Sequence, residues 1–290
     1  MRYGTGVALV LTAGLLWSFQ GLLIRQIDGA GPWAILFWRS LSMFPVVFLF
    51  LAWRTGGAPL PAIRAAGAAA VLGGIGLVVA MGGAIVAFQS TTVANAAFLF
   101  AASPFLAAVL GRILLGEAVA ARTGIAMAIA LLGVFLMVRD GLAAGAWLGN
   151  IAALVSAVGF ASFTVALRWR RLTDSLPTSV LGSFFAVVVG GIAALHMDQP
   201  LNLPVPDLLW CALMGAVTLS GGMILYTFGS RVVPSGELAL LASIEVMLAP
   251  FWVWLLLNET ASPATFLGGA IILVALLFNT LSAKRQLATV

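Results

Sequence analysis

The sequence predicts an all-α integral membrane protein with ten transmembrane helices, arranged as two inverted repeats of five helices. Three observations support this prediction. The 290-residue chain is 62% hydrophobic and only 8% charged, whereas soluble domains carry about 25% charged residues. Its apolar residues form ten runs of helical length. Features of the first five runs recur in the second five, and Glu259 follows Glu117 at a distance of 142 positions.

Each apolar run has about the 20 residues that cross roughly 30 Å of hydrocarbon as a helix. In chain order the predicted spans are Thr5–Ile24, Pro32–Trp53, Ala65–Phe88, Val93–Leu115, Arg122–Val138, Trp147–Leu167, Pro177–Leu195, Asp207–Phe228, Ser235–Leu257 and Pro263–Ser282. The links between them are short, so the chain has no room for a soluble domain between spans.

The basic residues predict which side of the membrane each link faces. With the N-terminus in the cytoplasm, eleven of the fourteen Lys and Arg residues lie in inner segments. Outer links hold only Arg25 and Arg139, and Arg39 lies inside the second span. Cytoplasmic links are enriched in Lys and Arg. We therefore expect a multi-pass protein of the cytoplasmic membrane with both termini in the cytoplasm.

Two long segments show the repeat most clearly. Asn95–Glu117 and Glu237–Glu259 each carry one proline, and each ends at a glutamate that another apolar run follows. Residues 1–141 and 142–290 are therefore predicted to be two copies of one unit. Because each unit has an odd number of spans, the second copy is inserted upside down. Inverted repeats of this kind place a substrate site near the midplane of many secondary transporters.

Several absences limit the function classes. The single cysteine, Cys211, excludes an internal disulfide and a thiolate-rich metal site. The single lysine, Lys284, excludes a phosphate-binding loop, so we expect no ATP and no other cofactor. His196 lies beside Asp198 without the partners that metal binding or general-base catalysis needs. The scattered basic residues do not form a face for nucleic acid. We expect no catalytic residue and no metal site.

Short elements in four spans resemble a known family in their order and spacing. They are Leu16-Trp17-Ser18, Phe37-Trp38-Arg39-Ser40, Ser103-Pro104, Leu115-Gly116-Glu117, Ile244-Glu245, Pro250 and Asn258-Glu259. Over essentially the whole chain they resemble the EamA-type branch of the drug/metabolite transporter superfamily. The resemblance implies a ten-span exporter of amino acids, related metabolites or drugs. Asn258 stands where the family usually has glycine, and Val246 stands where proline often follows the glutamate.

Ionisable residues at membrane depth are the strongest signal of a site, because each costs roughly 2.5 to 3.5 kcal/mol to insert. Arg39 either reaches the nearby membrane surface in a structural role or attracts a substrate carboxylate. Glu245 lies near the middle of the ninth span. Glu245 has two possible roles. One is functional, in proton coupling or in binding an amine, and the other is structural, as part of a buried hydrogen bond between helices. Glu117 and Glu259 are expected at helix junctions.

A substrate cavity should combine apolar and aromatic surface with a few polar groups. The residues expected to line it are Trp17, Gln20, Asn95, Ser103, Ser156, Phe160, Ser220, Tyr226 and Glu245. For each of them, a packed helix interface is the alternative role. The small-residue pairs Gly124/Ala128 and Ala264/Gly268 predict a close-packing face in the last span of each unit.

These patterns lead to one expected function and several alternatives. We expect a secondary transporter that exports amino acids, aromatic or other apolar ones, or related small metabolites, by alternating access. Its partners are a small-molecule substrate, the lipid bilayer and, if transport is coupled, protons; the sequence is compatible with a monomer and leaves the oligomeric state open. The alternatives are a drug or other metabolite exporter of the same fold, a channel, and a membrane-embedded enzyme.

Overall fold

The structure is a computed structural model that describes residues 2–143, 145–172, 174–233, 238, 241–242 and 244–287, and over these residues it is helical without any strand. Its elements are α1 (Tyr3–Ser18), α2 (Gln20–Ile24), α3 (Pro32–Arg54), α4 (Pro59–Ser90), α5 (Val93–Phe100), α6 (Ser103–Leu115), α7 (Ala121–Ala143), α8 (Trp147–Trp169), α9 (Leu176–His196), α10 (Val205–Ala212), the π-helix η1 (Leu213–Leu219), α11 (Ser220–Gly229), α13 (Ile244–Leu257) and α14 (Pro263–Leu287).

Eight helical segments in the described part of the chain are long and apolar enough to cross a membrane. Two shorter apolar helices, Ile244–Leu257 and Pro263–Asn279, accompany them. Together these segments occupy the ten predicted positions, and the chain is a multi-pass membrane protein. The start of the predicted ninth span, including Glu237, lies outside the described residues. The largest difference is in α4, which begins at Pro59 and is kinked at Gly67, where φ is 56°, a conformation that glycine adopts without strain.

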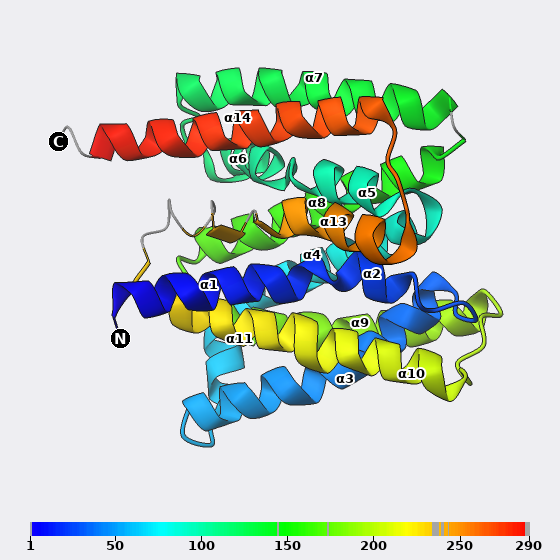
Figure 1. The fold of residues 1–290 in the computed structure, drawn as a ribbon. Helices are drawn as coiled ribbons and strands as arrows, with labels where there is room; N and C mark the ends of the chain where they lie inside the picture. The colour runs from blue at the N-terminus through cyan, green and yellow to red at the C-terminus, as the bar shows by residue number, and fades with distance from the viewer. Residues whose placement is uncertain are drawn as a thin grey trace.

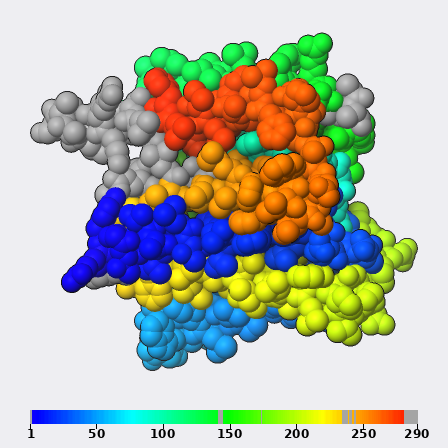
Figure 2. Space-filling model, viewed as in Figure 1, coloured from blue at the N-terminus to red at the C-terminus, as the bar shows by residue number. Residues whose placement is uncertain are grey.

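The helices run roughly along one common axis (Figure 1). The N-terminal helix α1 begins, and the C-terminal helix α14 ends, at the same end of the bundle. Helices α7 and α14 pack side by side along one edge, and α3 packs against α9 toward the opposite edge. Figure 2 shows α14, α13, α1 and α11 in succession across one face of the molecule.

Each end of the bundle carries an ion pair between the two halves of the sequence. At one end Arg25 Nε lies 2.7 Å from Glu259 Oε2, and at the other Arg168 Nη1 lies 2.7 Å from Glu117 Oε2. We name these the Glu259 end and the Glu117 end. Each glutamate follows a residue with positive φ, Gly116 at 69° or Asn258 at 54°, so both stand at helix junctions as predicted.

Three further predicted spans, besides the third with its kink at Gly67, are irregular in the structure. The first is interrupted at Phe19, between α1 and α2, and the fourth at Ala101–Ala102, just before Pro104. The eighth contains the π-helix η1. Irregular backbone at membrane depth must have its polar groups satisfied by protein or water. The hydroxyl of Ser220, the first residue of α11, donates to the carbonyl of Gly215 in η1 at 2.7 Å.

Helices α4 and α8 pack almost backbone to backbone, because glycines from both face the contact. A Cβ atom on Gly76 would lie 2.8 Å from the carbonyl oxygen of Gly159, and a Cβ atom on Gly159 would lie 2.5 Å from the backbone nitrogen of Ala80. The Ser156 hydroxyl adds a hydrogen bond of 2.6 Å to the carbonyl of Ala80. Small residues permit this close approach where helices pack in lipid.

The small-residue pair predicted in the fifth span does not contact another span of the described chain. Gly124 and Ala128 are exposed, and a Cβ atom on Gly124 would meet nothing within 4 Å. Helix α7 instead turns Gly133 toward α14, where a Cβ atom on Gly268 would lie 2.6 Å from its carbonyl oxygen. Helix α7 has small residues on two faces, and four-residue spacing alone does not tell which face is buried.

Candidate functional site

A buried polar cluster joins the first, second and eighth spans. It consists of Gln20 at the start of α2, Arg39 in α3 and Thr218 in η1, which are 8%, 3% and 4% exposed. Gln20 Nε2 donates to the Thr218 hydroxyl, and Arg39 Nη1 donates to Gln20 Oε1 at 3.5 Å. Gln20 follows the break at Phe19, and Thr218 lies in the π-helix. Two of the three residues therefore come from irregular helical segments.

The Arg39 guanidinium is poorly satisfied inside the protein. Its Nη2 donates to the carbonyl of Met81 at 3.3 Å, and its Nε has no hydrogen-bond partner. Both contacts of the guanidinium are longer than the 2.7 to 3.2 Å of ordinary N–H···O bonds. No carboxylate of the described residues forms an ion pair with Arg39. The residue is buried, so it does not reach the surface as one of its two predicted roles requires.

Close packing between α3 and η1 fixes the backbone beside Arg39. A Cβ atom on Gly215 would overlap the carbonyl oxygen of Arg39, so only glycine fits there. The Ser42 hydroxyl lies 2.8 Å from the carbonyl of Arg39 and 3.4 Å from that of Cys211. The position of the guanidinium relative to Thr218 is therefore set by direct contact between the two spans.

Aromatic side chains lie near this cluster in the chain. The rings of Trp17 and Tyr226 are 5.6 Å apart at an angle of 41°, and Trp17 Nε1 donates to the carbonyl of Leu219, the residue after Thr218, at 3.5 Å. Phe19, the residue before Gln20, stacks on Trp252 at 4.8 Å. Two aromatic pairs are thus attached to residues next to the polar cluster.

The other predicted cavity residues do not join this cluster. Ser220 and Ser156 donate to backbone carbonyls, as packed interfaces require. Phe160 is 46% exposed on the outside of α8, because that helix turns Ser156 and Gly159 toward α4. Ser103 is half-buried at the start of α6. Glu245 is half-buried in the first turn of α13.

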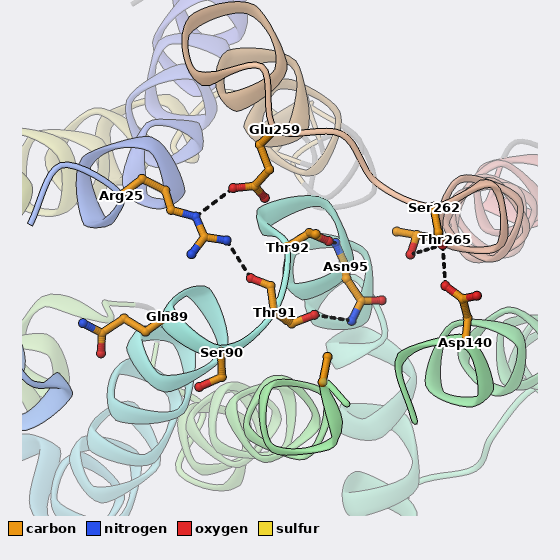
Figure 3. A pocket seen from close by; sticks show the side chains of 11 residues that line it. Arg25, Gln89, Ser90, Thr91, Thr92, Asn95, Asp140, Glu259, Ser262 and Thr265 are labelled. Carbon is orange, nitrogen blue, oxygen red and sulfur yellow. Dashed lines mark hydrogen bonds and ion pairs between the residues drawn. The ribbon is translucent and has the colours of Figure 1, made fainter. Parts of the chain in front are cut away.

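A cavity of about 470 Å³ opens at the Glu259 end (Figure 3). It is lined by Arg25, Gln89, Ser90, Thr91, Thr92, Asn95, Asp140, Ala146, Glu259, Ser262 and Thr265. Asn95 is the one predicted cavity residue in this lining. Arg25 also donates to the carbonyl of Thr91 at 2.7 Å, and Glu259 Oε1 accepts from the backbone of Val93 at 2.6 Å.

Two further polar groups face this cavity from different helices. Asp140 accepts a hydrogen bond from the Ser262 hydroxyl. Asn95 Nδ2 donates to Thr91 Oγ1 at 3.1 Å and to Asn150 Oδ1, whereas Asn95 Oδ1 has no hydrogen-bond partner although the residue is 3% exposed.

Sequence reasoning missed Thr218, Trp252, Asn150 and Asp140. The signal for Thr218 and Asn150 was available, because each is a polar residue inside an apolar run. Asp140 follows Arg139 and reads as part of a link, and the structure places it in the last turn but one of α7. Nothing in the sequence indicated that it would approach Ser262.

Comparison with known proteins identifies a family and several relatives. The profile of the EamA-like transporter family matches residues 4–139 and 147–281. An uncharacterized transporter of Archaeoglobus fulgidus is 28% identical over 281 residues, 96% of each chain. The pseudopaline exporter CntI of Pseudomonas aeruginosa is 25% identical over 279 residues, 93% of this chain and 94% of that protein.

A solved crystal structure matches 98% of this chain and 100% of its own, with a TM-score of 0.66 and 18% sequence identity. At that identity the likeness establishes the shared fold alone.

Proposed function

The chain belongs to the EamA-like transporter family, and we propose that it is a secondary transporter that exports amino acids or related small metabolites across the cytoplasmic membrane. Two relatives are named as a transporter and as an exporter, which supports export. The Glu259 end faces outward in this proposal. The links rich in arginine, which carry Arg54 and Arg168, lie at the Glu117 end, and such links face the cytoplasm.

The unsatisfied guanidinium of Arg39 is the observation that carries this proposal. A buried cation with long contacts and a free Nε is costly in a membrane. A substrate carboxylate would supply the missing negative charge and accept two parallel hydrogen bonds from the guanidinium. We therefore assign recognition of a carboxylate to Arg39, held in place by Gln20.

The aromatic surface beside the cluster favours a substrate with an aromatic or other apolar side chain. Trp17 contacts Tyr226, and Phe19, next to Gln20 in the chain, stacks on Trp252. A ring or branched chain gains contact with such surface, whereas a sugar or an inorganic ion does not. The relative named for pseudopaline export supports a second candidate, which is export of another small metabolite through the same site.

Alternating access supplies the transport cycle. Residues 1–141 and 142–290 act as two inverted units that rock about the midplane. The pair Arg25–Glu259 joins these units at one end of the bundle, and the pairs Arg168–Glu117 and Arg54–Asp174 join them at the other, so opening one end breaks the ion pairing there and keeps it at the opposite end. Partly exposed ion pairs contribute only about 0.2 to 1 kcal/mol, so the cycle can break them. The two separate matches to the family profile support this division.

Glu245 is the proposed coupling residue, because it is an acid in an apolar helix of the second unit. If transport is coupled to protons through Glu245, an imposed pH gradient accelerates uptake by wild-type proteoliposomes and leaves uptake by Glu245→Gln unchanged. Identical responses of the two proteins would remove Glu245 from coupling.

Counterflow in proteoliposomes tests the function itself. Vesicles loaded with one unlabelled amino acid at a time are diluted into trace labelled amino acid, and the initial rate is measured against concentration. We expect saturable counterflow with an amino acid that has an apolar or aromatic side chain. A flux that does not saturate indicates a channel. No flux with any amino acid overturns the substrate class.

A further inference from the structure

The cavity at the Glu259 end has an excess of negative charge. Arg25 and Glu259 neutralise each other at 2.7 Å; Arg25 also donates to the backbone carbonyl of Thr91, and Glu259 also accepts from the backbone of Val93. Asp140 has no cation partner within the described residues, and its hydrogen bond comes from the neutral hydroxyl of Ser262. One full negative charge in the lining is therefore unbalanced.

The cavity also offers a buried acceptor without a donor. Asn95 Oδ1 has no hydrogen-bond partner, while the amide nitrogen of the same side chain is occupied by Thr91 and Asn150. In Figure 3 the Asn95 amide stands between the Thr91 side chain and the Ser262 and Asp140 side of the cavity. A buried acceptor left unsatisfied costs about 1 to 3 kcal/mol, so a donor from a ligand would stabilise it.

A carboxylate that lines the cavity and an amide oxygen buried in the wall of the same cavity fit a positively charged hydrogen-bond donor. A primary ammonium group has three N–H donors and one positive charge, and so satisfies both Asp140 and Asn95. A divalent metal ion fits less well, because the described residues contain no group of three or more His, Cys, Asp or Glu side chains placed to hold one.

We propose that this cavity is a second binding site, which takes a primary ammonium group, with Asp140 as its counter-charge and Asn95 Oδ1 as an acceptor. Its role in transport rests on the proposed export of amino acids. The substrate carboxylate is held at Arg39, and the substrate ammonium group is bound at the Glu259 end as the substrate leaves. The binding site itself does not depend on that role.

Thermal unfolding of the purified full-length protein in detergent tests the site without any transport. The probes are ethylammonium chloride, tetramethylammonium chloride and sodium chloride at equal ionic strength. Ethylammonium should raise the unfolding temperature of the wild type in a saturable manner. Tetramethylammonium carries the same charge without an N–H group, so it should raise the unfolding temperature no more than sodium chloride does. An equal rise with ethylammonium and tetramethylammonium, or no rise with ethylammonium, overturns the proposal.

Two variants locate the effect. Asp140→Asn should weaken the apparent ethylammonium affinity by about tenfold or more, since hydrogen bonds to charged groups contribute about 1.5 to 3 kcal/mol. Asp28→Asn is the matched control, because Asp28 is exposed and lies outside the cavity lining, and it should respond like the wild type. Equal ethylammonium affinity in Asp140→Asn and in the wild type contradicts the assignment of Asp140. If Asp140→Asn does not fold, the comparison of ethylammonium with tetramethylammonium on the wild type tests the site.

This experiment measures binding and not transport. A negative binding result therefore leaves the counterflow result unaffected, and a negative counterflow result leaves the binding result unaffected.

Discussion

Two helix contacts in this protein, α4 with α8 and α1 with α11, differ at mid-depth, although glycines approach the partner backbone in both. The first brings together the third and sixth spans, and the second brings together the first and eighth, so the proposed two-fold axis exchanges them. Between α4 and α8 the contact is made by glycines, and the backbones nearly touch at Gly76 and Gly159. Between α1 and α11 large side chains stand at mid-depth, with Trp17 beside Tyr226.

Polar groups are divided between the contacts in the same way. The Ser156 hydroxyl at the α4–α8 contact donates its hydrogen bond to the carbonyl of Ala80. At the α1–α11 side, Gln20 and Thr218 join Arg39, whose guanidinium keeps an unpaired Nε. We infer that the α1–α11 side leaves a polar and aromatic region for a ligand, whereas glycines close the α4–α8 contact at the same depth. The proposed binding site lies where the two proposed repeats differ.

The largest expected effect is on stability and distinguishes the two contacts directly. A Cβ atom on Gly159 would meet the backbone nitrogen of Ala80 at 2.5 Å, whereas on Gly222 it would overlap the indole ring of Trp17, a side chain. Gly159→Ala should therefore destabilise the protein by about 1 to 3 kcal/mol, because helices must separate. Gly222→Ala should cost less, because only a side chain has to move.

Thermal unfolding of the two purified variants in detergent measures this difference, with transport as the second readout. Gly222→Ala should retain most stability but lower transport through the displaced Trp17. Equal stability losses in the two variants would show that the contacts do not differ in the way described.

Gln20→Glu should move stability and transport in opposite directions. The new carboxylate would lie where Gln20 Oε1 now accepts from Arg39, so it would pair with the guanidinium and compete with a substrate carboxylate. We expect a higher unfolding temperature and a substrate affinity at least about tenfold lower. Gln26→Glu, at a half-buried position outside the cluster, is the matched control. Unchanged transport by Gln20→Glu would separate the cluster from substrate binding.

A smaller effect is expected from the aromatic side of the site. Trp17→Ala removes the ring that contacts Tyr226. It should lower the affinity for aromatic amino acids by about two- to tenfold, because one contact between aromatic rings contributes about 0.5 to 1.5 kcal/mol. Affinity for small aliphatic amino acids should change little. Phe160→Ala serves as the control, because Phe160 is 46% exposed on the outside of α8. Counterflow competition curves for both variants measure the effect, and equal losses in the two would argue against a role for Trp17.

The sequence predicted the helical membrane fold well because apolar length decides where a chain can cross a bilayer. Nine of the ten predicted spans overlap described helices over nearly their full length, and the remaining one, the ninth span Ser235–Leu257, does so from Ile244 onward. The breaks were not predicted. Phe19 has no proline or glycine immediately before it, and the π-helix η1 depends on contact between Gly215 and α3.

The candidate site was predicted only in part, because depth along a helix says little about direction around it. Arg39 and Gln20 stood out as polar residues in apolar spans, and the structure brings them together. Phe160 lies at a similar depth but points outward, since its neighbour Gly159 faces α4. Which of two polar residues at one depth turns inward depends on tertiary packing.

The central claim is that the Arg39 guanidinium recognises a substrate carboxylate. The most direct measurement compares counterflow inhibition by the transported amino acid and by its carboxamide, in wild type, Arg39→Lys and Arg39→Gln. The wild type should prefer the acid by about tenfold or more, Arg39→Lys should keep part of this preference, and Arg39→Gln should lose it. The same preference for the acid in Arg39→Gln as in the wild type would contradict the account.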